Sequence, residues 1–335
     1  MMEIELVGLD GRHLLAYLAS LGTHLALAHK RPDVTMRWDE NTYHPTIALP
    51  VQDPPPPDLE DHREAQIKLI DGYGLQAPPP PDLKDHVASL LESALKELAN
   101  TGSGRRFPSH WNNITVPRTD FQDSVLKPSA EKVRNDRTQR TWADFAAGLG
   151  SDAASTDKKL DYTALCVITG DSRQDFLRLM RDLSNDVTSE HLKSTLFERW
   201  KYQERGKSFR WDPQEDRRYA LRASDPSDGP DREIPSMWGA NRLAFEALAC
   251  FPCFPRGRRV RTTAFDDERT IHWPLWTPLL NVETVKSLLA HPAVLVNDLR
   301  VLKALGVFAV ASARRISVDR KRSFGPASIR LVGGN

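Results

Sequence analysis

Two nearly identical proline-rich segments divide the first third of the chain. They read PPPPDLEDH over residues 54–62 and PPPPDLKDH over residues 78–86. Four consecutive prolines fix the backbone φ angle and lack N–H donors, so each segment is expected to form stiff polyproline II rather than helix or central strand. The aspartate that follows each tetraproline is a good N-cap, so each segment is expected to begin a helix. Recognition by a proline-binding domain is the alternative role.

Apolar spacing predicts a helix and two strands before the first proline segment. Leucines recur at helical spacing over residues 12–30, where Gly22 is either a point of close helix packing or a break between two helices. Residues 33–38 and 42–49 follow the pattern of a strand pair. Pro45 predicts an edge position or a bulge for the second strand, because proline cannot donate to a strand ladder.

The rest of the chain mixes helical and extended patterns without regular alternation. Helices are predicted over residues 83–98, 173–183, 189–200, 238–250, 282–290 and 297–305. Strands are predicted over residues 3–9, 160–170, 260–265, 270–276, 307–318 and 327–332. The sequence therefore predicts an α+β fold with a mixed, largely antiparallel sheet, packed helices and irregular topology. We expect two regions, 1–104 with the proline-capped helices and 105–335 with a basic C-terminal part.

Composition argues against several classes of protein. The chain is 40% hydrophobic and 27% charged, as soluble globular proteins are. It contains no run of 18 apolar residues, so we expect no membrane span and no membrane partner. Its first residues are acidic and then patterned, unlike a secretory signal. Three cysteines are few and odd in number, which favours a reducing compartment, and we expect a cytoplasmic protein.

Positive charge gathers toward the C-terminus. From residue 251 onward there are 14 Lys and Arg against 6 Asp and Glu, whereas the first 250 residues carry 32 against 39. The segments PRGRRVRT (255–262) and ARRISVDRKRSF (313–324) cluster arginines that can grip phosphates through paired hydrogen bonds. The residues predicted to contact nucleic acid are Arg256, Arg258, Arg259, Arg261, Arg314, Arg315, Arg320, Lys321, Arg322 and Arg222.

Aromatic residues lie between the two arginine segments. Single-stranded nucleic acid binds where cationic side chains meet flat aromatic faces, which makes Phe265, Trp273 and Trp276 candidates for base stacking. The alternative is that they pack in the core, and for the tryptophans we favour packing.

The chain carries no recognisable catalytic motif. The phosphate-binding loop, the dinucleotide fingerprint, the zinc-protease helix and the nucleophile elbow are all missing from the sequence. The Cys250–Cys253 pair stands alone, whereas a structural zinc site needs four ligands, so these cysteines are expected to pack. We therefore predict no catalytic residue, metal ligand or cofactor. The alternative is a nuclease that uses His13 or His24 as general acid–base.

The stretch SFRWDPQEDRRYALRASDPS, residues 208–227, is unusually dense in charge. We interpret it as a turn followed by a strand, in which acids hold arginines in place and one arginine projects toward a ligand. The arginine candidates are Arg210, Arg217 and Arg222. The alternative is a catalytic metal site, with ligands drawn from Asp212, Glu215, Asp216 and Asp225.

Four segments together resemble one family. They are LVGLDGRHLLAYLASLGTHLAL, ERWKYQERGKSFRWDPQEDRRYALRASDPS, GANRLAFEALACFPCFP and FDDERTIHWPLWTPLLNVETVKSLL. In this order they resemble CRISPR-associated proteins of type I systems, subtype I-G (formerly I-U), of the large-subunit-like or helicase-nuclease extension group. The resemblance extends over residues 3–49 and from residue 163 to the end.

The resemblance implies a nucleic-acid-binding, non-catalytic subunit or accessory factor of an antiviral interference complex. Its implied partners are other effector subunits, guide RNA or target DNA or both, and the helicase-nuclease. In such complexes base pairing reads the target while protein subunits hold the backbones. The alternatives are an adaptor that recruits the helicase-nuclease without touching nucleic acid, and the nuclease considered above.

Overall fold

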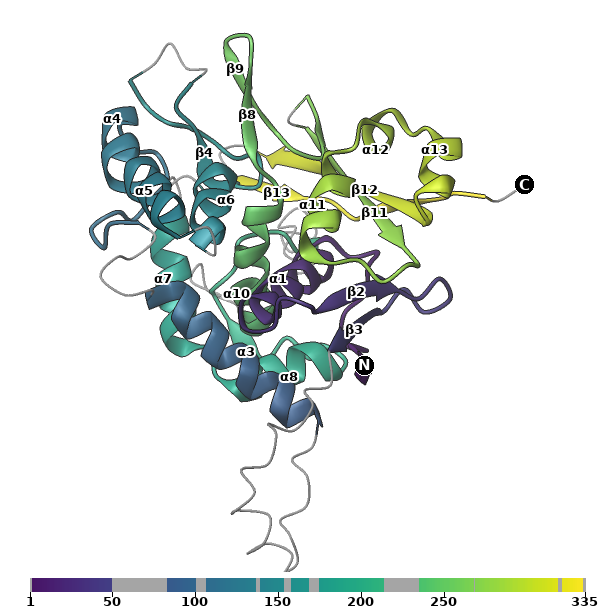
Figure 1. Ribbon diagram of the computed structural model, residues 1–335. Helices are drawn as coiled ribbons and strands as arrows, with labels where there is room; N and C mark the ends of the chain where they lie inside the picture. Colours follow the sequence, from purple (N-terminus) through teal and green to yellow (C-terminus); the bar gives the residue numbers. More distant parts are fainter. Residues whose placement is uncertain are drawn as a thin grey trace, which may run out of the picture.

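The computed structural model describes residues 2–49, 83–100, 107–136, 139–153, 158–168, 175–213, 235–267, 269–318 and 321–333. The structure has 46% helix and 24% strand, in several small antiparallel sheets with helices packed around them (Figure 1). The α+β fold predicted from the sequence is therefore confirmed.

Helices are the most abundant secondary structure in the described chain. They are α1 (Leu14–Lys30), α3 (Leu83–Asn100), α4 (Arg118–Phe121), a π-helical turn (Gln122–Leu126), α5 (Lys127–Asn135), α6 (Arg140–Leu149), α7 (Phe176–Asp186), α8 (Ser189–Phe197), α10 (Trp238–Glu246), a 3-10 turn (Ala247–Cys250), α11 (Val282–Ala290), α12 (Pro292–Val296) and α13 (Leu299–Ala304). The segments around 83–98, 189–200, 238–250 and 282–290 are helical as predicted.

The strands within the described residues form one three-stranded sheet, one five-stranded sheet and three two-stranded pairs. The first sheet has the order β1 (Met2–Glu5), β3 (Pro45–Leu49), β2 (Thr35–Trp38). The second has the order β10 (Phe265–Asp266), β11 (Thr270–Trp276), β12 (Val307–Val318), β13 (Lys321–Phe324), with β14 (Ser328–Leu331) also paired to β12. The pairs are β4 (Gly150–Ser151) with β5 (Asp161–Tyr162), β6 (Glu204–Arg205) with β7 (Pro235–Ser236), and β8 (Cys253–Arg256) with β9 (Arg259–Thr262).

Helices α1 and α10 cross at the centre of the molecule (Figure 1). Every residue of α1 from Leu14 to Leu27 is buried, which explains why this helix is apolar on all sides. A β-carbon added at Gly22 would lie 1.8 Å from the carbonyl oxygen of Leu243 on α10. Of the two roles expected for Gly22, close packing is therefore the one observed, since α1 continues through it without a break.

Two tryptophan side chains tie the five-stranded sheet to the N-terminal part of the chain. The Nε1–H of Trp273 donates to the carbonyl oxygen of Gly11 at 2.8 Å, and that of Trp276 donates to the carbonyl oxygen of Met36 at 3.0 Å. Both indoles are fully buried. A buried indole N–H usually has a hydrogen-bond acceptor, because leaving it without one would destabilise the fold. These two bonds therefore help to determine how the five-stranded sheet packs against the N-terminal part of the chain.

Several strand predictions were wrong in part, and the strands expected over residues 3–9 and 260–265 end early, at Glu5 and Thr262. Pro45 was expected at an edge or bulge, but β3 is the central strand of its sheet. Pro45 is tolerated because it is the first residue of that strand, where its missing N–H interrupts no ladder bond. The predicted strand over residues 160–170 shortens to Asp161–Tyr162, and residues 163–168 are buried without strand pairing.

One hydrophobic core contains residues from both sides of the boundary expected near residue 104. It includes Leu18 and Leu91 together with Phe245 and Trp273. The division into two regions stays a prediction. The first proline segment, the second tetraproline and the strand expected within the charged stretch, over residues 218–223, lie outside the described residues.

Within the described ranges, no helix combines the length and the apolarity that crossing a membrane requires.

Candidate nucleic-acid interface

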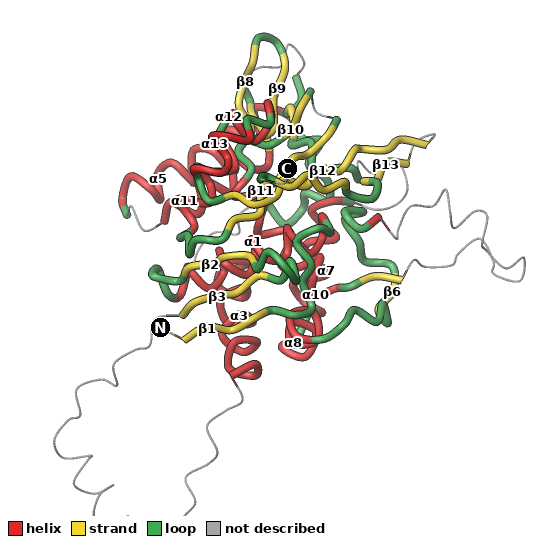
Figure 2. The backbone as a smooth tube through the Cα atoms, turned by 90° about the vertical axis from the view of Figure 1, so that its right-hand side faces the viewer, coloured by secondary structure: helices red, strands yellow, loops and turns green. Residues whose placement is uncertain are grey.

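The β8–β9 hairpin stands out from the body of the molecule (Figures 1 and 2). It is a two-stranded pair of its own, in which Arg256 lies opposite Arg259. Its connection is the two-residue loop Gly257–Arg258, with Gly257 at φ 65°. Glycine at the first position with positive φ is the requirement of a type II′ hairpin turn, so this local sequence specifies the hairpin.

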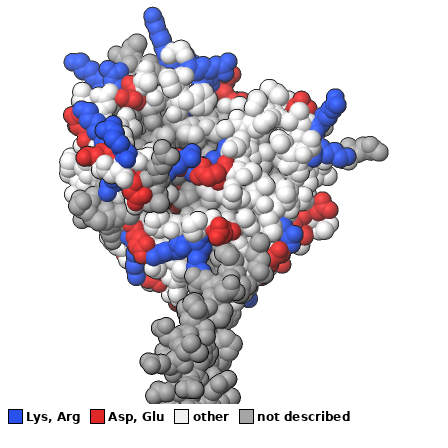
Figure 3. All heavy atoms as spheres, in the orientation of Figure 1, with Lys and Arg blue, Asp and Glu red and all other residues white. Residues whose placement is uncertain are grey.

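Three arginines surround the tip of this hairpin. Arg256, Arg258 and Arg259 are exposed, and none of them forms an ion pair with another described residue. Several Lys and Arg groups project at the top of the molecule, where the hairpin lies, with uncharged atoms between them (Figure 3). Like charges directly opposite each other on a strand pair are destabilising, so this arrangement does not serve the stability of the hairpin. It concentrates positive charge where a phosphate backbone has free access.

An aromatic side chain accompanies these arginines. Phe254 on β8 is 47% exposed, and it is the one aromatic among the exposed large hydrophobic residues that the structure describes. A flat apolar ring beside several guanidinium groups is the combination that single-stranded nucleic acid uses, with bases on the ring and phosphates on the arginines.

The fourth arginine of this segment has a different environment. Arg261 pairs with Asp267 at 2.8 Å, and its side chain is only 21% exposed. This pair links the base of the hairpin to the residue that follows β10, so Arg261 has an ionic partner within the fold that the three arginines at the tip lack among the described residues.

The second predicted cluster lies on the β12–β13 pair. Arg314 is exposed, whereas Arg315 donates from Nη2 to the carbonyl oxygen of Cys166 at 3.5 Å. Arg322 is half-buried and lies opposite Ser317, which places it on the same face as Arg315. Burial raises the pKa of the Cys166 thiol to about 12, and the nearby charges of Arg315 and Arg322 oppose this only in part.

The two clusters do not share one surface at their tips. In Figure 2 the β8–β9 hairpin points upward, whereas the end of β12–β13 points to the right. Lys321 begins β13, and Arg320 and Arg222 lie outside the described residues. Of the two, the β8–β9 hairpin has the larger number of exposed, unpaired arginines among the described residues.

The aromatic residues predicted between the clusters belong to the core. Phe265 is 4% exposed, and Trp273 and Trp276 are fully buried. Trp273 lies against Tyr17, with ring centroids 5.6 Å apart. Packing, which the sequence favoured for the tryptophans, is confirmed. Phe254 was missed because the aromatic candidates were taken from between the two arginine segments, and Phe254 lies just before the first of them.

A second polar cluster joins residues far apart in the sequence. His13 Nε2 lies 3.1 Å from Asp212 Oδ1, and the Tyr202 hydroxyl donates to Asp212 Oδ2 at 2.9 Å. The Asp212 side chain is fully buried, and that of His13 is 24% exposed. Tyr202 and Arg210 have positive φ angles of 52° and 62°, which L-residues other than Asn and Asp rarely adopt.

The hydrogen bonds of His13 assign its tautomer. Nδ1 accepts from the backbone N–H of Ala16 at 3.4 Å and so caps the N-terminus of α1. Nε2 must then carry the proton and donate it to Asp212. A neutral His13 held in this way has no free lone pair for a substrate, and the cluster orients the start of α1 against the 200–212 segment.

The other histidine considered for catalysis is enclosed. His24 is 1% exposed, and its Nε2 lies 3.1 Å from the carbonyl oxygen of Val34. Burial lowers the pKa of His24 to about 4. Its ring is therefore neutral at physiological pH and out of reach of a substrate.

The described residues contain no group of three His, Cys, Asp or Glu that could hold a metal ion. Cys250 is buried and Cys253 half-buried, and neither forms a disulfide. Of the acids proposed with Asp212 as metal ligands, Glu215, Asp216 and Asp225 lie outside the described ranges.

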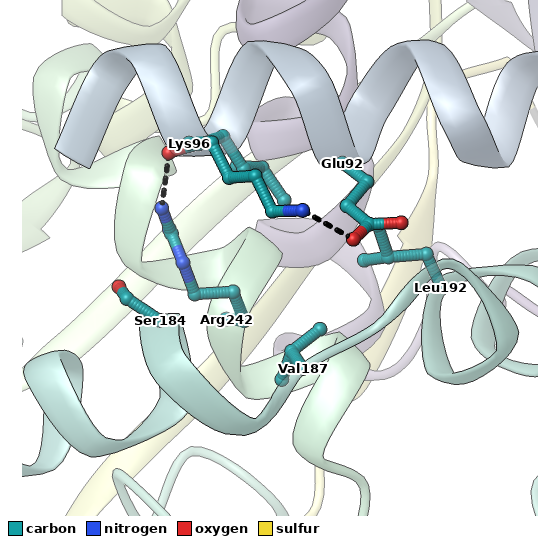
Figure 4. Close-up of a pocket in the computed structure, with 7 residues that line it drawn as sticks. Glu92, Lys96, Ser184, Val187, Leu192 and Arg242 are labelled. Carbon is teal, nitrogen blue, oxygen red and sulfur yellow. Dashed lines mark hydrogen bonds and ion pairs between the residues drawn. The ribbon is translucent and has the colours of Figure 1, made fainter. Parts of the chain in front are cut away.

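A small depression lies between α3, α7, α8 and α10 (Figure 4). Its polar groups are bonded to one another: Lys96 pairs with Glu92 at 2.7 Å, and Arg242 donates to the carbonyl oxygen of Leu95 at 3.1 Å. Arg242 also pairs with the fully buried Glu246 at 2.7 Å. These bonds explain the polar residues through packing between helices.

No protein-family model matches this chain, and no curated protein matches it in sequence.

Proposed function

We propose that this protein binds single-stranded nucleic acid through the tip of the β8–β9 hairpin, as a non-catalytic subunit or accessory factor of a type I CRISPR interference complex. The observation that carries the binding proposal is the group of Arg256, Arg258 and Arg259 at the tip of a projecting hairpin, exposed and without ion pairs to described residues, with Phe254 beside them. Arginines without an ion-pair partner among the described residues can bind phosphates, and the exposed ring of Phe254 can stack on bases. Together they fit a single-stranded nucleic acid as the ligand.

The assignment to CRISPR interference is supported by the resemblance of four sequence segments to the subtype I-G group. It implies guide RNA or target DNA as the ligand, and other effector subunits and the helicase-nuclease as partners in the cytoplasm. The binding proposal is independent of it, since the binding proposal rests on the hairpin.

The binding proposal is tested by titrating fluorescent dT20 and rU20 with the full chain. Replacing Arg256, Arg258 and Arg259 by Glu is expected to weaken binding at least 100-fold. The matched control replaces three exposed basic residues on other elements, Arg134, Arg300 and Lys303, by Glu and so changes the net charge equally. Because the hairpin carries the contact, the fold-loss of affinity in the control variant is expected to be less than a fifth of the fold-loss in the hairpin variant.

The outcomes separate the proposals. An equal loss of affinity in both triple variants would show that binding depends only on the net charge of the protein. That result would overturn the hairpin as the binding site. No binding by the wild-type chain at low salt would favour the adaptor, which recruits a protein partner without touching nucleic acid.

A nuclease is the second candidate, because the structure brings His13 within 3.1 Å of Asp212 across 199 residues of sequence. It is tested with labelled single-stranded DNA and RNA in magnesium and in manganese. Cleavage that His13→Gln abolishes in a folded protein would establish it. We expect no cleavage, since the Nδ1 lone pair of His13 is used by Ala16.

A further inference from the structure

Exposed apolar residues gather on one corner of the molecule. Of the eight exposed large hydrophobic residues that the structure describes, four lie between residues 295 and 305. Leu295 is 40% exposed, Val296 73% and Leu299 42%. A single exposed apolar residue needs no explanation, but a local group of them marks an interaction surface.

The fold explains how these residues come together. Helix α12 ends at Val296, Asn297 turns the chain with a left-handed φ of 56°, and α13 begins at Leu299. The Asp298 carboxylate accepts from the Val301 N–H at 3.2 Å and caps α13. The corner is thus a formed structure, and Leu295, Val296 and Leu299 stand at its bend.

Buried residues on the inner side hold the corner to the body. Ala293 and Val294 of α12 and Leu302 of α13 are at most 3% exposed. Helix α12 lies against β11, and α13 lies against β12. The inner face of each short helix is therefore already used, and the outer face is without a partner among the described residues.

Positive charge borders the apolar group. Arg300 and Lys303 are exposed on the outer face of α13, with Lys303 one helical turn after Leu299. Neither forms an ion pair with another described residue. Lys and Arg atoms stand at the right-hand edge of Figure 3, where Figure 1 places α13.

We propose that this corner patch (Leu295, Val296, Leu299, Arg300 and Lys303) docks an acidic amphipathic helix of a partner protein. The apolar stripe of that helix would cover Leu295, Val296 and Leu299, and its flanking carboxylates would pair with Arg300 and Lys303. Helices bind to apolar surfaces through residues spaced three and four apart, and complementary charge sets their orientation and specificity.

The charges argue against a second copy of the chain as the occupant. A two-fold symmetric contact places the same patch against itself. Arg300 and Lys303 of both copies would then gather in one interface, and bringing like charges together there is costly. An acidic partner removes this repulsion.

The test uses two synthetic 18-residue helical peptides with the same leucine stripe, one flanked by Glu and the other by Lys. Fluorescence anisotropy with the full chain is expected to show at least tenfold tighter binding of the Glu peptide. Val296→Asp is expected to weaken that binding at least tenfold, since it places a carboxylate in the apolar group. The Arg300→Glu, Lys303→Glu double variant is expected to invert the preference between the peptides. Val7→Asp, at an apolar residue 44% exposed elsewhere, is the matched control and is expected to bind as wild type.

Equal binding of both peptides, or a preference that the double variant does not invert, would overturn the proposal. So would no binding of the Glu peptide at 200 µM. Sedimentation and flotation with phosphatidylserine vesicles complete the test. Dimerisation or vesicle binding that Val296→Asp abolishes would assign the corner patch to a second copy or to lipid instead. A thermal melt of each variant ensures that every loss comes from a folded protein.

Discussion

The α1–α10 contact and the β8–β9 hairpin use the same residue types under opposite constraints. Arg242 on α10 is 2% exposed and bonded to Glu246 and to Leu95, whereas Arg258 at the hairpin tip is exposed and forms no ion pair with a described residue. Gly22 lies against a backbone carbonyl, whereas nothing lies within 4 Å of a β-carbon added at Gly257. An arginine or a glycine therefore indicates a functional role only when its contacts within the fold do not already explain why that residue is there.

The largest effect is expected from breaking the buried ion pair. Arg242→Ala leaves Glu246 buried without its arginine, and removing one partner of such a pair costs about 3–5 kcal/mol. Urea denaturation measures the free energy of unfolding. The Arg242→Met, Glu246→Leu double variant should recover most of the loss, because it removes both charges. A loss below 1 kcal/mol in the single variant would show that the pair is solvated.

The next effect compares the two glycines. Gly22→Ala should lower the free energy of unfolding by about 3 kcal/mol, since its β-carbon collides with a backbone atom of α10. Gly257→Ala meets no atom and strains only the φ angle of the turn, at a local cost of about 1–2 kcal/mol. Thermal melts should therefore rank Gly22→Ala well below Gly257→Ala. The reverse ranking would contradict the close contact between α1 and α10.

The interior should also respond to pH, and the hairpin should not. Burial lowers the pKa of His24 from 6.5 to about 4, so below pH 6.5 the unfolded chain takes up a proton that the folded chain excludes. Stability is then lost as the pH falls, by about 2 kcal/mol between pH 6.5 and 5 from this group. His24→Gln, which keeps a donor for Val34, should flatten this part of the stability profile. An identical profile in the variant would place the pH dependence elsewhere.

The smallest effect belongs to the aromatic residue of the hairpin. Phe254→Ala should weaken the binding of dT20 by about 1 kcal/mol, the lower end for loss of a stacked base, because the ring is half exposed. The free energy of unfolding should change by no more than about 0.5 kcal/mol, as for other surface substitutions. A duplex of the same length should lose less, since its bases are already stacked. An equal loss for duplex and single strand would argue against stacking on Phe254.

Local signals allowed much of the fold to be predicted. The strand Val307–Val318 has the bounds that were predicted, and α8 begins at Ser189, where its helix was predicted to begin. The position of β3 could not be predicted, because the place of a strand in its sheet depends on partners distant in sequence. Pro45 correctly indicated a position without a backbone N–H donor. In the structure that position is the first residue of β3 and not an edge strand or a bulge.

The candidate site shows the same division. Clustered arginines around a glycine turn could be recognised in PRGRRVRT, and the turn proved to be the tip of a hairpin. Burial could not be recognised: Trp273 and Phe254 are both aromatic residues near arginines, yet only Phe254 is exposed. The contact between His13 and Asp212 spans 199 residues, so no spacing rule could reveal it.

The salt dependence of binding tests the central claim most directly. Each phosphate neutralised on a single strand contributes about 0.7 to the slope of log K against log salt concentration. If Arg256, Arg258 and Arg259 each contact one phosphate, replacing all three by Ala should reduce the slope for dT20 by about 2 and leave the melting temperature nearly unchanged. An unchanged slope in the folded triple variant would show that the hairpin does not hold the nucleic-acid backbone.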